Sequence, residues 1–110
     1  MTQGIKTFLY PVKDGDRAKL FYSTLLGIEP HTDGPYYVGF KIGDQEIGLV
    51  PNGLNAPISY IHVADIQKTI QSLFDAGATI GQEVKNVGGG RLVASVKDPD
   101  GNVIGLLQSA

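Results

Sequence analysis

The stretch KDPDGNVIGLLQ, residues 97–108, joins a tight turn to a β-strand that carries a glycine, Gly105, near its middle. The run DPDG at 98–101 suits the turn, because Pro pre-sets φ, Asp bonds its own backbone and Gly accepts a positive φ. Glycine weakens a strand interior, so Gly105 indicates a bulge or the close approach of another group. The stretch has a counterpart, because EIGLV at 46–50 is repeated as VIGLL at 103–107.

Working outward from these endings, the chain divides into two halves with one plan. In the first half, Asp16 is the expected N-cap of a helix that carries Phe21, Leu25 and Leu26 along one face and ends at Gly27. In the second half, Asp65 caps a helix whose apolar residues recur at helical spacing. The expected strands lie at about 5–12, 31–34, 36–43 and 45–51 in the first half, and at 58–63, 79–87, 90–98 and 102–108 in the second.

The repeat predicts a single domain, residues 1–110, built from two βαβββ modules. Module one covers about 4–51, a linker covers about 52–57, and module two covers about 58–108. A ferredoxin-like pair of βαβ units would also repeat, but it fits one helix followed by three strands poorly.

Composition excludes several function classes. The chain has 110 residues, is 42% hydrophobic and carries a net charge of −2 with no cysteine, so disulfides and Cys-type zinc sites are excluded. Lys and Arg are scattered without interleaved aromatics, which argues against nucleic acid as a partner. No apolar run approaches the ~18 residues of a membrane span, and the N-terminus lacks the features of a signal peptide. We therefore expect a cytoplasmic protein with no membrane partner.

With LFYSTLLGIEP at 20–30 and DPDGNVIGLLQ at 98–108, the sequence resembles the vicinal oxygen chelate superfamily. That group includes glyoxalase I, extradiol dioxygenases and bleomycin- and fosfomycin-resistance proteins. The similarity covers about residues 5–108. It implies an α+β fold in which two tandem βαβββ modules form an open, cupped, eight-stranded barrel-like sheet with helices outside. It also implies a homodimer.

The resemblance also locates the four positions at which the metal enzymes of the family carry ligands. These positions fall at Thr7, Gly48, Ile58 and Gly105, where His, Gln or Glu would be needed. None of the four is a good ligand, so we expect no metal at this position and no cofactor. Gly105 occupies the place of a carboxylate, which is what the resemblance implies for the glycine in the opening stretch.

Strand alternation then predicts which residues share the inferred cavity. On this interpretation Tyr60 and His62 face inward with Ile58, and Ser59, Ile61 and Val63 face the helix layer. The cavity is mostly apolar and aromatic, as small-molecule sites are. The predicted ligand-binding residues are Thr7, Leu9, Phe40, Glu46, Gly48, Tyr60, His62 and Gly105.

His62 is the only candidate catalytic residue, since imidazole titrates near neutral pH and can act as a general base. A histidine at a strand end is more often satisfied by backbone or by a partner chain, and one His without a fixed partner specifies no reaction. Glu46 follows a turn, which favours a surface charge over a cavity carboxylate, and His31 lies in a loop-like stretch, which favours a solvated residue over a ligand.

Three functions remain open at this level. The first is a metal-independent member, of the bleomycin-resistance type, that binds an apolar or aromatic organic molecule in the barrel cavity or a dimer groove. The second is a glyoxalase-like lyase or dioxygenase with a displaced divalent-metal site built from His62, Glu46 and His31. The third is a structural or regulatory dimer. The missing ligands favour the first, because metal catalysis needs convergent, oriented donors.

Overall fold

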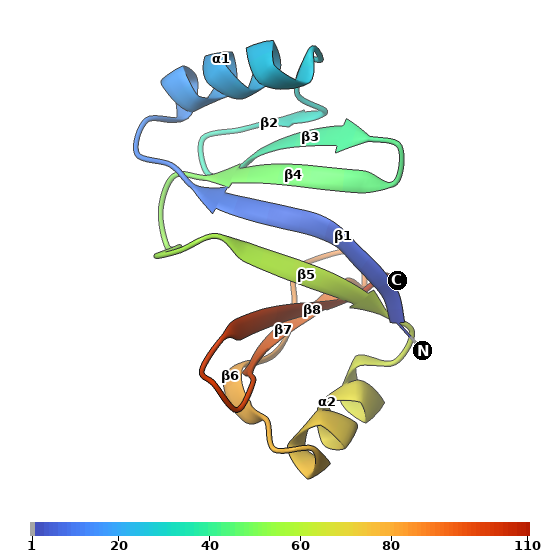
Figure 1. Cartoon of the computed structure of the whole chain (residues 1–110). Helices are drawn as coiled ribbons and strands as arrows, with labels where there is room; N and C mark the ends of the chain where they lie inside the picture. The colour runs from blue at the N-terminus through green and yellow to red at the C-terminus, as the bar shows by residue number, and fades with distance from the viewer. Residues whose placement is uncertain (1) are drawn as a thin grey trace. The chain divides into compact units, whose positions relative to one another are not determined.

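The computed structural model describes residues 2–110, which group into two compact units. The N-terminal unit is Thr7–Ile58; the C-terminal unit is Ser59–Ala110 together with residues 2–6. Figure 1 shows the elements of both. In chain order they are β1 (Thr2–Pro11), α1 (Gly15–Leu26), β2 (Thr32–Asp33), β3 (Val38–Ile42), β4 (Gln45–Val50), β5 (Ile58–Val63), α2 (Ile66–Asp75), β6 (Thr79–Asn86), β7 (Leu92–Lys97) and β8 (Val103–Gln108).

The strands repeat one pairing scheme. The hydrogen-bonded order is β2-β3-β4-β1 in the first group and β5-β8-β7-β6 in the second. In each group the strand before the helix runs parallel to the last strand, and the remaining pairs are antiparallel. The predicted α+β fold with two successive βαβββ modules and an open arrangement of eight strands is therefore confirmed over residues 2–110.

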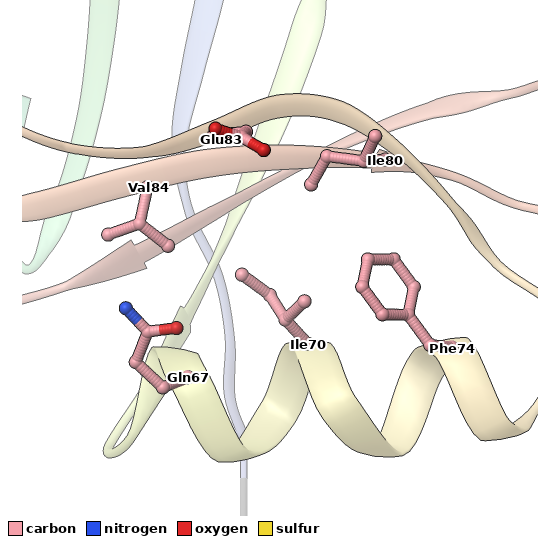
Figure 2. A pocket seen from close by; sticks show the side chains of 6 residues that line it. All are labelled: Gln67, Ile70, Phe74, Ile80, Glu83 and Val84. Carbon is pink, nitrogen blue, oxygen red and sulfur yellow. The ribbon is translucent and has the colours of Figure 1, made fainter.

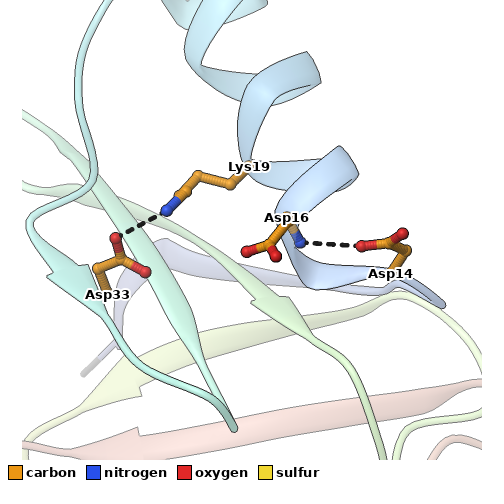
Figure 3. Close-up of polar contacts among 4 residues, drawn as sticks. All are labelled: Asp14, Asp16, Lys19 and Asp33. Atoms are coloured by element: carbon orange, nitrogen blue, oxygen red, sulfur yellow. Dashed lines mark hydrogen bonds and ion pairs between the residues drawn. The ribbon is translucent and has the colours of Figure 1, made fainter.

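Helix α1 begins at Asp14, whose Oδ1 accepts hydrogen bonds from the backbone N–H groups of Asp16 (3.1 Å) and Arg17 (3.2 Å). The expected cap, Asp16, is thus wrong by two residues: it lies in the first turn, where its charge suits the helix dipole. The helix ends as predicted at Gly27, whose φ of 71° favours glycine. Figure 3 shows the Asp14 cap and the 3.0 Å ion pair between Lys19 on α1 and Asp33 on β2.

The core of the N-terminal unit lies between α1 and its sheet. Val38, Phe40 and Leu49 are buried there, and Ala18, Tyr22 and Leu26 pack on them from successive turns of the helix. Phe21 and Leu25, predicted to share one face of the helix with Leu26, are instead 63% and 65% exposed. That prediction was wrong because α1 carries apolar residues on two stripes, and only one stripe contacts the sheet.

The core of the C-terminal unit lies between α2 and its sheet. Ile66 and Ile70 are buried against residues of β5, β7 and β8, among them Val63, Ala94 and Leu106. Asp65 caps the helix as predicted, accepting from the Lys68 backbone N–H at 3.1 Å. Gln108 Oε1 on β8 accepts from the Ile66 N–H at 2.8 Å, which ties the start of α2 to the sheet.

Neither helix within residues 2–110 has the length and apolar character that crossing a bilayer requires.

Candidate functional site

The position of the core shows which face of the sheet in the N-terminal unit is not covered by a helix. Tyr10 and Leu49 pack on the core beneath α1. Because successive side chains of a strand point to opposite faces, Leu9 on β1 and Gly48 on β4 belong to the other face. They are direct neighbours across the parallel β1–β4 pair, as are Thr7 and Glu46. The predicted residues Thr7, Leu9, Glu46 and Gly48 are therefore on one face.

An aromatic ring covers the glycines of this face. A Cβ at Gly48 would lie 2.5 Å from Tyr37 Cε1 and 2.5 Å from Leu9 Cδ2, and a Cβ at Gly39 would lie 2.8 Å from Tyr37 Cε2. Gly39 and Gly48 are paired residues on β3 and β4. The Tyr37 ring thus occupies the space that side chains at both positions would need.

The Tyr37 hydroxyl donates a hydrogen bond to Glu46 Oε2. This bond fixes the ring over the two glycines and fixes the carboxylate beside Thr7. A carboxylate has about four acceptor sites on two oxygens, so one bond from a hydroxyl leaves acceptor capacity. The face combines apolar surface with a positioned acceptor.

The C-terminal unit repeats the arrangement with a different ring. Gly105 on β8 pairs with Tyr60 on β5, and a Cβ at Gly105 would lie 2.5 Å from Tyr60 Cδ1. Burial raises the pKa of the Tyr60 phenol, so its hydroxyl stays protonated at neutral pH. Ile61 and Val63 pack on the core beneath α2, so Tyr60 and His62 alternate to the helix-free face, as the sequence predicts.

The two units match in register as well as in order. Leu9 pairs with Gly48 in the first, and Tyr60 pairs with Gly105 in the second. Thr7 and Ile58, each two residues before the paired strand residue, occupy equivalent places. The pseudo-symmetric positions inferred from the sequence therefore agree with the strand pairing.

The residues at these four positions do not fit a divalent metal. Gly48, Gly105 and Ile58 have no donor atom in their side chains, and Thr7 offers a hydroxyl where imidazole or carboxylate is needed. Above each glycine an aromatic ring fills the space from which a ligand side chain would reach a metal. Nowhere in residues 2–110 do three or more His, Asp or Glu side chains gather closely enough to hold an ion.

The structure corrects the predicted position of Phe40. The sequence placed it among the cavity residues, but it is fully buried in the core cluster with Val38 and Leu49 beneath α1. Alternation separates the two faces of β3 correctly, yet it does not say which face meets the helix. Phe40 stabilises the unit and cannot contact a ligand on the helix-free face.

The two histidines differ in setting. His62 is half-buried on β5, beside Leu107 of β8. His31 is exposed in the connection before β2, with its Nδ1 3.4 Å from Thr32 Oγ1 and its backbone N–H donating to Gly39 O at 2.7 Å. His31 and Glu46 do not belong to any metal-binding cluster among the described side chains.

Two polar residues of these faces were missed from the sequence. Tyr37, whose ring covers Gly39 and Gly48, was given no role from the sequence. Ser95, which pairs with Gly105, is buried, and its Oγ accepts from the Gln82 backbone N–H at 2.8 Å. No sequence signal marks Ser95, because its role depends on an irregularity in β6.

Comparison with known proteins gives one family. The profile of the Glyoxalase/Bleomycin resistance protein/Dioxygenase superfamily matches residues 4–106. No curated protein sequence matches the chain significantly.

Several solved structures share the fold. Methylmalonyl-CoA epimerase from Mycobacterium tuberculosis has a TM-score of 0.80 at 16% identity, covering 99% of this chain and 89% of that one. A Mn(II)-bound glyoxalase from Novosphingobium aromaticivorans has a TM-score of 0.76 at 22% identity, covering 97% of this chain and 39% of that one. A superfamily member from Vibrio splendidus 12B01 has a TM-score of 0.74 at 18% identity, covering 99% and 100%. At these identities the likeness extends to the fold alone.

Proposed function

This chain belongs to the Glyoxalase/Bleomycin resistance protein/Dioxygenase superfamily, and we propose that it is a ligand-binding member that uses no metal at the family's position. Its ligand is a small apolar or aromatic organic molecule with a hydrogen-bond donor. The observation that carries the proposal is the tyrosine ring over Gly39 and Gly48, hydrogen-bonded to Glu46.

The chemistry of this face supports ligand binding more than metal catalysis. Tyr37 and Leu9 supply apolar contact area, and Glu46 supplies an oriented acceptor. Small-molecule sites combine an apolar lining with a few placed polar groups. At Gly48 and Gly105 an aromatic ring fills the space in which a metal enzyme would carry a ligand side chain.

The binding experiment uses amide-resolved NMR with a panel of aromatic and amphipathic molecules. We expect saturable shifts confined to Leu9, Tyr37 and Gly48. Glu46→Gln keeps the shape and one acceptor but removes the charge. It should weaken ligands that carry a donor by about tenfold, because a hydrogen bond to a charged group contributes about 1.5 kcal/mol or more.

Glu29→Gln is the matched control, since Glu29 is an exposed carboxylate in the same unit outside this face. It should leave every affinity unchanged. A panel in which no molecule saturates would leave the structural or regulatory dimer as the better interpretation. Equal loss in both variants would show that net charge matters and Glu46 does not.

Metal analysis separates this proposal from a displaced-metal lyase or dioxygenase. The purified protein is measured before and after incubation with nickel, zinc, manganese and iron(II). We expect no stoichiometric metal. Stoichiometric metal that a chelator removes would contradict the proposal and make Glu46 and His62 the first residues to replace.

We also propose that the protein works as a homodimer, which rests on family resemblance. Sedimentation equilibrium should give the mass of two chains across the concentrations used for binding. A single-chain mass throughout would overturn this part of the proposal and leave the binding experiment unaffected.

A further inference from the structure

A groove of about 490 Å³ lies between α2 and β6, on the helix-covered side of the C-terminal unit. Figure 2 shows Gln67, Ile70 and Phe74 rising from successive turns of α2 toward Ile80 and Val84 on β6. Ile70 is part of the buried core, whereas Phe74 and Ile80 are 40% and 41% exposed. The groove therefore has an apolar floor and apolar walls open to solvent, and its volume lies in the range of small-molecule sites.

A bulge in β6 brings Glu83 to the wall of this groove. Gln82 pairs with Ser95 and Lys85 pairs with Val93, so Glu83 and Val84 together oppose the single residue Ala94. Ala94 is buried in the core beneath α2. In a regular strand Glu83 and Val84 would point to opposite faces, but two residues opposite one let both line the groove.

The Glu83 charge has no partner within residues 2–110. No ion pair or hydrogen bond joins its side chain to another described residue. Gln67 lines the same groove from α2, on the wall opposite β6. An unpaired negative charge above an apolar floor is complementary to a molecule that joins a cation to an apolar group. Phe74 adds a ring face to which a cation is also attracted.

We propose that the α2–β6 groove is a second binding site, which takes an amphiphilic organic cation. The ammonium group contacts Glu83, and the apolar group lies between Phe74, Ile80 and the Ile70 floor. This site is on the helix-covered side of its sheet and does not depend on the helix-free faces described above.

The test uses phenethylammonium and its neutral analogue, phenethyl alcohol, with methyl-resolved NMR of the full chain. We expect phenethylammonium to shift the Ile70, Ile80 and Val84 methyl signals saturably, with a dissociation constant in the millimolar range. Phenethyl alcohol should bind about fivefold more weakly, as the value of an exposed ion pair indicates. Glu83→Gln should abolish this difference between the two probes.

Asp75→Asn is the matched control, since Asp75 is an exposed carboxylate on the same helix outside the groove. It changes the net charge equally and should preserve the preference for the cation. Equal affinity for both probes in the wild-type protein would overturn the proposal, as would shifts that spare the three methyl groups. A Glu83→Gln variant that binds both probes as the wild-type protein does would also overturn the proposal. If that variant also self-associates, the role of Glu83 is to keep the edge strand β6 from pairing with another chain.

Discussion

At the residue scale, the Tyr60 ring above Gly105 occupies the space that a side chain at this residue would need. A Cβ there would lie within 2.8 Å of three atoms of the Tyr60 ring, including Cγ, which is close to the backbone and has little freedom to move. Gly105→Ala should therefore lower the free energy of unfolding by about 1–3 kcal/mol, the usual cost of overpacking. Urea unfolding measures this value. In a Tyr60→Ala background the same substitution should cost almost nothing.

Gly15→Ala is the control for this cycle. Gly15 has ordinary space around it, because a Cβ at this residue would have its nearest heavy atom 3.8 Å away, in the Pro51 ring. Its replacement should change the free energy of unfolding by no more than about 0.5 kcal/mol. An equal cost of Gly105→Ala with and without the Tyr60 ring would show that the backbone, and not the ring, requires glycine.

The raised pKa of Tyr60 gives a pH dependence with a definite sign. An unfolded tyrosine loses its proton near pH 10, and burial delays this loss in the native state. Below about pH 10 both states hold the proton, and above it the unfolded state holds fewer protons than the native state. The free energy of unfolding should then fall as pH rises.

Urea unfolding at a series of alkaline pH values measures this slope, and Tyr60→Phe should make it shallower. Tyr22 retains part of the slope, because burial also raises the pKa of its phenol, with a smaller contribution from Tyr10. A slope that is identical in the wild-type protein and in Tyr60→Phe would exclude Tyr60 as its source.

The residue scale also shows where inference from sequence ends. The glycines, their register and the inward direction of Tyr60 follow from turn chemistry and period-two alternation, both of which are local. The position of the Tyr37 ring over two strands and the burial of Phe40 beneath α1 depend on which face the helix covers. That choice is tertiary and leaves no mark in the local pattern.

At the element scale, the start of α1 depends on one of two nearby carboxylates. Asp14 accepts from two backbone N–H groups, whereas Asp16 lies within the first turn. Asp14→Ala should lower the free energy of unfolding by about 1 kcal/mol, the typical value of an N-cap. Asp16→Ala should lower it by only a few tenths, through the helix dipole. Thermal or urea unfolding of both variants decides the assignment, and a larger loss in Asp16→Ala would reverse it.

The helices show why periodicity predicted one face correctly and another incorrectly. On α2 the apolar residues form one stripe, and Ile66 and Ile70 are buried as expected. On α1 two stripes compete: Ala18, Tyr22 and Leu26 contact the sheet, and Leu20, Phe21 and Leu25 remain more than 60% exposed. A period of 3.6 residues locates stripes, but it cannot rank two apolar ones. The residues of β6 were predicted as a strand, but its bulges were not, because a bulge can be located only when the residues opposite it on the pairing strand are known.

At the scale of the whole molecule, the repeat predicted the correct element order because each module is a complete helix-on-sheet layer. Each unit has its own buried cluster, and the two clusters share no residue. The order and type of elements could be predicted because the signal occurs twice along the chain. The identity of a ligand could not, because it depends on side chains brought together by strand pairing.

Separate cores predict additive effects of core truncation. Val38 is 3% exposed in the N-terminal core and Val96 is 1% exposed in the C-terminal core. Each Val→Ala change removes two methyl groups and should lower the free energy of unfolding by about 2 kcal/mol. Because effects at sites without shared partners add to within about 0.5 kcal/mol, the double variant should lose the sum. Urea unfolding of the two single variants and the double variant measures the sum directly. A loss that departs from it by more than about 1 kcal/mol would show that the clusters are energetically coupled. A second unfolding transition in either single variant would instead show that the units lose their structure independently.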